Sequence, residues 1–248
     1  MYTKIVKAFF SAAFAVLLSI LCGCDDAKNS DELKIAVCAD YPPFEYYENG
    51  ELTGFDIDIA KLIGQELKQK VKFEEMQFPA ILASLQQKAV DAAISAIAIT
   101  EERKKKNDFS SEYYSEASFA TVYKKSHPVR GREQLEQSKV ACQLGSTMEI
   151  WLKANCPRAI IVAIDNNNQA VEMLKAGHVN CVFINLVQGK AFCLNNDDLG
   201  FSKIAESANG YAVALQKGSG LREKIDKAIE KLKSTGKIDQ LRKKWSLE

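Results

Sequence analysis

The chain has 248 residues, of which 47% are hydrophobic and 26% are charged. This composition is that of an ordinary globular protein, and the length allows two modest domains. The formal net charge is only +1. The chain therefore lacks the basic excess typical of nucleic-acid-binding proteins, and we expect no nucleic-acid partner.

The N-terminus has the pattern of a secretory signal peptide. Lys4 and Lys7 precede an apolar segment that runs from Ala8 to Leu21. This segment, at about 14 residues, is shorter than the roughly 20 residues that span a bilayer. A charged start followed by a short apolar segment is typical of an export signal, so we expect residues 1–23 to be removed.

The signal ends in Leu21-Cys22-Gly23-Cys24, which resembles the bacterial lipobox. In that motif a leucine stands three residues before the cysteine that receives the lipid. The spacing fits Cys24, which would become the lipidated N-terminus of a periplasmic, membrane-anchored protein, with residues 24–32 as a polar tether. The alternative is a plain signal peptide with incidental cysteines.

The remaining cysteines and the two histidines limit other chemistry. Five cysteines follow the expected lipidation site, namely Cys38, Cys142, Cys156, Cys181 and Cys193. Because five is odd, at least one thiol is free or pairs outside the chain, and the pairing stays open. The sequence has no CxxC spacing, and His127 and His178 are its only histidines. We therefore expect neither a metal site nor a cofactor.

From residue 33 the chain alternates short apolar segments with amphipathic ones, which predicts an α/β fold with parallel strands. In the first series we expect strands at 33–37, 71–76 and around Ile94, with helices at 55–68 and 80–87. Asn49-Gly50 marks a turn between them. In the second we expect strands at 139–142, 159–163 and 179–184, with helices from Ser146 and at 169–176.

Two similar series imply two Rossmann-like lobes. The strand-like segments 119–123 and 207–215 connect them, and helices at 221–233 and 237–245 return to the first lobe. The predicted lobes are 33–118 with 211–248, and 119–210. Paired extended connectors form a hinge, and open α/β sheets bind ligands at the carboxyl ends of their strands.

Arg103 is an unusual residue for its position, the first turn of a helix after the apolar segment around Ile94. A cation there opposes the helix dipole, so one interpretation is a guanidinium that faces an anionic ligand. The other is a solvated arginine paired with Glu101 or Glu102.

A second anion site is predicted where the segment Gly145-Ser146-Thr147 enters a helix. Gly145 permits a tight turn, and Ser146 with Glu149 fits a capping box. Such a helix start presents free N–H groups to an anion, although most capping boxes are purely structural.

The segment Gly54-Phe55-Asp56-Ile57-Asp58-Ile59-Ala60 resembles the signature of the bacterial solute-binding proteins of family 3, the receptors of polar amino-acid ABC importers. The resemblance continues through Tyr41-Pro42-Pro43-Phe44-Glu45-Tyr46, Ile99-Thr100-Glu101-Glu102-Arg103, Asp108-Phe109-Ser110 and Gly145-Ser146-Thr147 to the C-terminal helices. It implies the type II periplasmic-binding-protein fold and a ligand held between lobes.

By this resemblance Tyr41 and Phe78 are aromatic walls, although core packing is an alternative for both. Arg103 would pair with the ligand carboxylate. The strand-end and second-lobe contacts implied are Ser95, Ala96, Ala98, Ser146 and Thr147.

The chain departs from the family where the α-ammonium is usually held. Ala98 replaces a hydroxyl residue, Asn185 replaces an acid, and Cys38 replaces a position that is often acidic and reads the distal end of the ligand. A charged hydrogen bond contributes about 1.5 to 3 kcal/mol, so an ordinary amino acid could lose about one to two factors of ten in affinity. The ligand is therefore an amino acid bound with compensating contacts, or a carboxylate without an α-ammonium.

Three functions compete. The first is a monomeric substrate-binding lipoprotein that delivers a small carboxylate or amino acid to an ABC permease, without catalysis. The second is an enzyme like the exported cyclohexadienyl dehydratases, for which Glu149 and Asp40 are conceivable acids. The third is a sensor or structural lipoprotein with a degenerate pocket.

Overall fold

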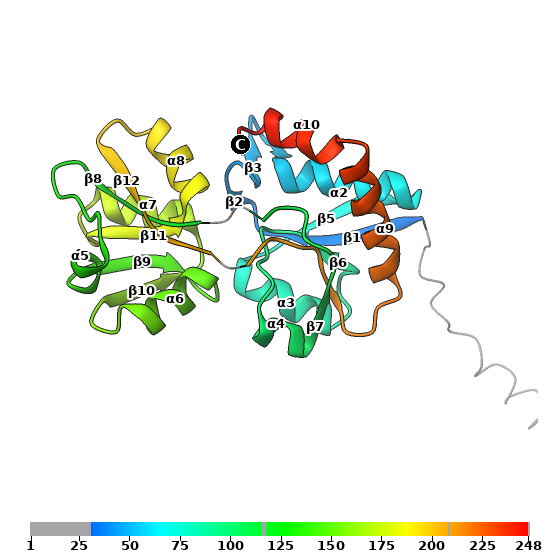
Figure 1. Cartoon of the computed structure of the whole chain (residues 1–248), viewed down its shortest axis with the longest axis horizontal. Coiled ribbons are helices and arrows are strands. Elements are labelled where there is room, and N and C mark those ends of the chain that lie inside the picture. Colours follow the sequence, from blue (N-terminus) through cyan, green and yellow to red (C-terminus); the bar gives the residue numbers. More distant parts are fainter. Residues whose placement is uncertain (1–30, 116–117, 208, 248) are drawn as a thin grey trace, which may run out of the picture. The chain divides into compact units, whose positions relative to one another are not determined.

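The computed structural model describes residues 31–115, 118–207 and 209–247. They form two five-stranded sheets, each with helices on both faces, and a small three-stranded sheet (Figure 1). The expected signal peptide, lipobox and Cys24 lie outside the described residues. Within the described part of the chain, no helix combines the length and apolar character needed to cross a membrane.

The first sheet has the order β5-β1-β6-β13-β7. These strands are β5 (Lys70–Glu75), β1 (Glu32–Val37), β6 (Ala92–Ala93), β13 (Ala214–Gln216) and β7 (Asn107–Phe109). β1 runs parallel to β5 and β6, whereas β13 is antiparallel to β6 and β7. In this sheet the predicted parallel arrangement is correct for β5, β1, β6 and β7. β13 runs in the opposite direction, because it returns from the other lobe.

Alternating side chains of β1 pack on the two faces of this sheet. Leu33 and Ile35 share a core with α2 (Phe55–Leu67) and α9 (Leu221–Ser234). Ala36 packs in a separate core with α3 (Phe78–Gln86). α10 (Lys237–Lys244) contacts α2 and α9 on the first face, while α4 (Glu101–Lys106) precedes β7 (Figure 1). A sheet covered on both faces has apolar side chains in both directions, which is why Leu33 and residues 35–37 of β1 are buried.

The second sheet has the order β10-β9-β11-β8-β12. Its strands are β10 (Ile160–Ile164), β9 (Lys139–Gln143), β11 (Cys181–Asn185), β8 (Ser118–Lys124) and β12 (Leu199–Glu206). β9 is parallel to β10 and β11, and β8 is antiparallel to β11 and β12. Val140 and Cys142 of β9 pack with Leu152 of α6 (Thr147–Asn155), whereas Ala141 packs with Leu174 of α7 (Asn167–Lys175).

Several elements differ from the sequence expectation. The segment 119–123 is the core of β8 and belongs to the second sheet, so it is more than a connector. β12, α8 (Leu186–Leu194) and α5 (Arg132–Glu136) were not predicted. α3 begins at Phe78 rather than residue 80, because Pro79 fits the first turn of a helix, where no N–H is needed.

The two chain segments that link the sheets lie side by side at Tyr114 and Tyr211. The backbone N–H of Tyr211 donates to the carbonyl oxygen of Tyr114 at 2.7 Å, and their rings stack with centroids 5.6 Å apart. This contact joins the crossing segments at the position where the hinge is expected.

A hairpin-like sheet of β2 (Asp40–Tyr41), β3 (Glu45–Glu48) and β4 (Glu51–Thr53) precedes α2. The predicted turn at Asn49-Gly50 connects β3 and β4. Gly54 then has a φ of 129°, and a Cβ there would lie 2.1 Å from the carbonyl oxygen of Phe44. Only glycine allows this close approach, which brings the start of α2 against the start of β3.

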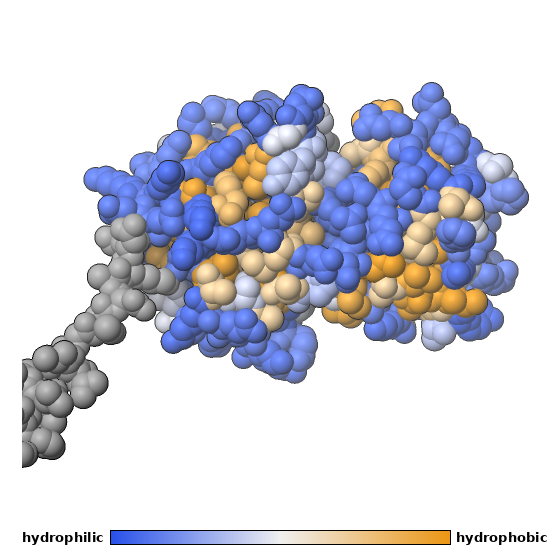
Figure 2. All heavy atoms as spheres, turned by 180° about the vertical axis from the view of Figure 1, so that it is seen from behind, coloured by the Kyte–Doolittle hydropathy of each residue, from blue (hydrophilic) through white to orange (hydrophobic). Residues whose placement is uncertain are grey.

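The five cysteines of the described residues all have free thiols, and only Cys193 is partly exposed. The face drawn in Figure 2 is mostly hydrophilic, with apolar residues in smaller areas between the charged ones. Leu194 is the most exposed large hydrophobic side chain of the described residues.

Candidate ligand-binding site

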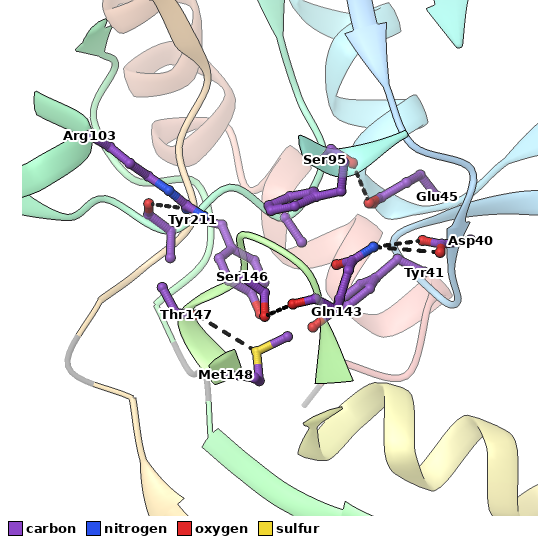
Figure 3. Close-up of a pocket in the computed structure, with 13 residues that line it drawn as sticks. Asp40, Tyr41, Glu45, Ser95, Arg103, Gln143, Ser146, Thr147, Met148 and Tyr211 are labelled. Carbon is purple, nitrogen blue, oxygen red and sulfur yellow. Dashed lines mark hydrogen bonds between the residues drawn. The ribbon is translucent and has the colours of Figure 1, made fainter. Parts of the chain in front are cut away.

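A cavity with about 320 Å³ of empty space, part of it open to solvent, lies where the two lobes meet (Figure 3). Eight predicted site residues line it: Tyr41, Phe78, Ser95, Ala96, Ala98, Arg103, Ser146 and Thr147. Five others that line it were not predicted as ligand contacts: Asp40, Glu45, Gln143, Met148 and Tyr211. Nowhere in the described residues do three histidine, cysteine or acidic side chains group to hold a metal ion.

Arg103 is in α4, where Thr100 caps the helix by accepting the backbone N–H of Arg103 at 3.2 Å. Its side chain is buried, and the guanidinium donates to the carbonyl oxygens of Ala98 at 2.8 Å and Gly145 at 3.1 Å. The guanidinium also lies 5.5 Å from the centre of the Phe78 ring. The solvated interpretation is wrong, since Glu101 and Glu102 pair with Lys104 and Lys105.

Burial lowers the pKa of Arg103 to about 10. The guanidinium therefore remains charged at neutral pH, although the two groups that accept its hydrogen bonds among the described residues are neutral carbonyl groups. A buried cation is normally compensated by an anion. No acidic side chain in the described residues forms an ion pair with Arg103, so an anionic group in the cavity would complete the site.

The second-lobe loop before α6 has a modified capping box. Ser146 caps α6 by accepting the N–H of Glu149 at 3.2 Å, and it also donates to the carbonyl oxygen of Gln143 at 2.6 Å. Glu149 accepts the N–H of Gly145 at 2.7 Å, one residue earlier than in the standard motif. Among the described residues, the hydroxyl of Thr147 hydrogen-bonds only the sulfur of Met148, at 3.7 Å. Thr147 and the free amides of the first helical turn are thus the available donors.

Two predicted site residues do not line the cavity. Cys38 is buried beside it and donates from its thiol to Asp40 at 3.4 Å. Asn185 lies behind Tyr211: its side-chain amide donates to the Tyr211 hydroxyl at 3.0 Å, and its oxygen caps α8. Tyr211, which lines the cavity, therefore stands between Asn185 and any ligand.

Asp40 joins the two lobes at the end of the cavity opposite Arg103 (Figure 3). Its carboxylate accepts the backbone N–H of Asn167 at 2.8 Å and lies 3.4 Å from the side-chain nitrogen of Gln143. Gln188 donates to the Asp40 carbonyl oxygen at 3.1 Å. Burial raises the pKa of Asp40, while these hydrogen bonds oppose that rise.

Glu45 and Asp56 form a buried acid pair next to the cavity. Glu45 accepts the hydroxyl of Ser95 at 2.8 Å, and Asp56 accepts the N–H of Ala96 at 2.7 Å. Ser95 and Ala96 line the cavity, so this pair supports part of its wall. Neither acid was predicted as a site residue, because no local sequence pattern shows that β3 and α2 meet.

Residues 33–248 match the family model of the bacterial extracellular solute-binding proteins, family 3. The chain belongs to this family. The resemblance found in the motifs is confirmed, and with it the α/β fold of two lobes that is characteristic of the type II periplasmic binding proteins.

Two relatives of this family 3 protein come from Bacillus subtilis strain 168. The arginine-binding extracellular protein is 31% identical over 93% of this chain and 94% of its own length. The glutamine-binding protein of an ABC transporter is 30% identical over 98% of each chain. Among solved structures, an amino acid ABC transporter substrate-binding protein of Streptococcus pneumoniae with bound L-arginine has a TM-score of 0.82. It is 34% identical over 89% of this chain and 96% of its own.

Proposed function

We propose that this protein is the substrate-binding lipoprotein of an ABC importer, and that it binds an amino acid or a related small carboxylate between its lobes. The observation that carries the proposal is the buried guanidinium of Arg103, which faces the cavity and hydrogen-bonds only neutral carbonyl groups among the described residues. A ligand carboxylate supplies the missing anion, and the arginine fork binds it with charge-assisted hydrogen bonds. Both relatives named above bind amino acids, which supports the same ligand class.

In this proposal the two lobes are 33–118 with 211–248 and 119–210. They meet through the hydrogen bonds of Arg103 to Gly145 and of Asn167 to Asp40, and the second lobe completes the carboxylate site. Thr147 and the first-turn amides of α6 approach the carboxylate from the side opposite Arg103. Ser146 holds the loop in place through its bonds to Gln143 and Glu149. The positive end of the α6 dipole favours the same anion.

The α-ammonium is held by weaker contacts than in the usual family site. Ala98 offers a methyl group, and Asn185 acts on the ligand through the hydroxyl of Tyr211, to which it donates. Cys38 also affects the ligand only indirectly, because its thiol donates to Asp40, which lines the cavity. Tyr41 and Phe78 form the aromatic walls of the cavity, with Phe78 also lying against the guanidinium of Arg103.

The proposed function does not include catalysis. Glu149 does not line the cavity and instead bonds the N–H of Gly145 and the ammonium of Lys153. Asp40 accepts several donors and so is already engaged as a hydrogen-bond acceptor. Neither carboxyl group is positioned as a free general acid or base.

We further propose that residues 1–23 are removed on export and that a lipid on Cys24 anchors a monomeric protein in the cell envelope, through the tether 24–32. Mass spectrometry of the mature N-terminus tests this directly. A diacylated N-terminal cysteine is the expected result, and Cys24→Ser would release the protein from the membrane fraction. An unmodified mature N-terminus beyond residue 24 would refute lipidation while leaving the ligand proposal intact.

The ligand proposal is tested by thermal shift on protein that begins after Cys24. The amino acids are compared with their 2-oxo and 2-hydroxy counterparts. A ligand at 100 times its dissociation constant stabilises by about 2.7 kcal/mol, which a melting curve resolves. Arg103→Ala should abolish this stabilisation, whereas the exposed Arg130→Ala should retain it. Equal stabilisation of wild type and Arg103→Ala would reject the proposed role of Arg103.

A further inference from the structure

A second groove lies on the second lobe, apart from the interlobe cavity. It holds about 1280 Å³ of empty space, part of it open to solvent, and it shares no lining residue with that cavity. Most of its wall comes from α8 and from the adjoining ends of β8 and β12, the two strands against which α8 packs (Figure 1). Three basic and two apolar side chains define this α8 groove: Lys125, Arg130, Lys190, Leu194 and Phe201.

α8 lacks the polar outer face of an ordinary surface helix. Lys190 is its only charged residue, and its last four residues, 191–194, are apolar without being buried. Leu194 is 82% exposed, and Phe201 of β12 is 39% exposed. A helix that is apolar on all sides normally packs against a further apolar surface. The α8 groove therefore has the character of a contact surface.

The same groove is positively charged. Lys125, Arg130 and Lys190 are exposed, and none of them forms an ion pair with another described residue. Lys125 donates to the backbone carbonyl oxygen of Asp197 at 2.7 Å, which is a neutral acceptor. Asp197 and Asp198 follow α8, but no acidic side chain of the described residues lines the groove. Three cations beside exposed apolar side chains match an occupant that has both negative charge and hydrocarbon.

A bilayer that contains anionic phospholipid offers this combination. Basic side chains at such a surface lie among the lipid phosphates, and neighbouring apolar side chains enter the boundary of the acyl chains. The nine residues of the tether, 24–32, extend to about 30 Å at most. A lipid on Cys24 would thus hold the folded protein close to a bilayer, where a weak surface contact is sufficient.

We propose that the α8 groove is a membrane-contact site that binds anionic phospholipid at the bilayer surface. Its three basic side chains pair with lipid phosphates, while Leu194 and Phe201 enter the acyl boundary. The contact holds the second lobe at the membrane and leaves the interlobe cavity free, because the two sites share no lining residue. The role of the tether rests on the proposed lipidation. The contact itself requires neither a lipid on Cys24 nor an amino-acid ligand.

Co-sedimentation with vesicles measures the contact. The chain from residue 24 onward is used with Cys24→Ser, so that no covalent lipid carries it to the vesicles. Each basic residue near an anionic surface contributes roughly fivefold to binding, so vesicles with phosphatidylglycerol should bind it roughly 100-fold more tightly than vesicles of phosphatidylcholine alone. Raising the salt from about 0.1 M to about 1 M shortens the Debye length from about 10 Å to about 3 Å and should release most of the bound protein.

A pair of triple variants locates the charges. The groove variant replaces its three basic residues by glutamine, as Lys125→Gln, Arg130→Gln and Lys190→Gln. Its partition onto the anionic vesicles should fall roughly 100-fold. The control removes the same charge from exposed lysines of α9 and α10 in the first lobe, as Lys224→Gln, Lys227→Gln and Lys237→Gln. Its partition should stay close to that of the parent, since charges outside the contact are screened.

A pair of single variants tests the apolar part. Leu194→Ser removes the most exposed apolar side chain of the groove and should lower partition onto the anionic vesicles by roughly tenfold. Ile160→Ser is the control, because Ile160 is also well exposed, at 64%, but lies on β10 and outside the groove. This control should bind as the parent does. Melting curves check that all four variants are folded.

Several outcomes would overturn the membrane-contact site. They are failure of the folded parent to bind anionic vesicles, equal binding to both kinds of vesicle, and equal loss of binding in a groove variant and its control. Self-association in solution that Leu194→Ser abolishes would assign the groove to a second copy of the chain and would also overturn it. None of these results bears on the ligand site at Arg103 or on lipidation, which the thermal-shift and mass-spectrometry experiments test separately.

Discussion

The guanidinium of Arg103 and the carbonyl oxygen of Gly145 are 3.1 Å apart, and this hydrogen bond connects α4 of the first lobe to the loop before α6 of the second. One residue thus faces the cavity and contacts both of its walls. The carbonyl group satisfies part of the guanidinium but does not neutralise it. A ligand carboxylate would bind Arg103 and at the same time approach the first turn of α6, which couples ligand binding to lobe closure.

Arg103→Lys should weaken amino-acid binding even though it keeps the charge. A lysine ammonium lacks the planar fork that reaches Ala98, Gly145 and a carboxylate together. Loss of a charged hydrogen bond costs about 1.5 to 3 kcal/mol, so we expect the Kd for L-arginine to rise by roughly 10-fold to 150-fold. Calorimetry measures the change, with Arg130→Lys as the control. An unchanged Kd would mean that ligand binding depends on the positive charge at residue 103 and not on the planar geometry of the guanidinium.

Asn185→Asp should strengthen the binding of ligands that carry an α-ammonium. The Asn185 amide now donates to Tyr211 and so occupies a lone pair of its hydroxyl. A carboxylate at this position would accept from Tyr211 instead and free its lone pairs for the ammonium. One added hydrogen bond contributes about 0.5 to 1.5 kcal/mol, so the Kd for L-arginine should fall by up to about tenfold. The 2-oxo counterpart of L-arginine lacks the ammonium and serves as the control ligand; weaker binding of L-arginine would contradict the argument.

The pH dependence of stability should report the Glu45 and Asp56 pair. Both carboxyl groups have a raised pKa in the folded protein, so folding is favoured when they are protonated. Their contribution is fully present below the pKa values of the unfolded chain, near 4, and is lost as the pH rises through the value of about 7 for Asp56. Glu45→Gln cannot lose the proton, so its stability relative to wild type should increase between pH 4 and 8. Urea denaturation at several pH values tests this, and a constant difference would contradict the raised pKa of Glu45.

Gly54→Ala should destabilise the protein strongly. The added Cβ would lie 2.1 Å from the Phe44 carbonyl oxygen, and a φ of 129° is strained for any other residue. We expect a loss of at least about 3 kcal/mol in the free energy of unfolding. Gly220→Ala is the control, because its Cβ meets no atom within 4 Å and its φ is −65°, so it should change stability by less than about 0.5 kcal/mol. Similar losses in both variants would show that the close approach at Gly54 is unimportant.

Much of the fold follows from local sequence. The apolar segments that became β1, β9 and β11 were recognisable because both faces of these strands are buried. β12 was missed because its buried and exposed residues do not form a clear apolar run, and it is a strand only through its pairing with β8. The antiparallel direction of β8 and β13 could not be predicted from the sequence either, since it depends on the side from which the chain enters each sheet.

The sequence by itself determined the family, the two α/β lobes and the candidate role of Arg103. An arginine at the start of a helix opposes the helix dipole, and the neighbouring residues alone show that it has this position. Only the tertiary structure decided which acids reach the cavity. Asp40 bonds Asn167 of the other lobe, Asn185 is screened by Tyr211, and Glu45 meets Asp56 through the close approach at Gly54. These contacts join residues that are distant in the chain, and the charge of a buried carboxyl group depends on such neighbours rather than on its own sequence position.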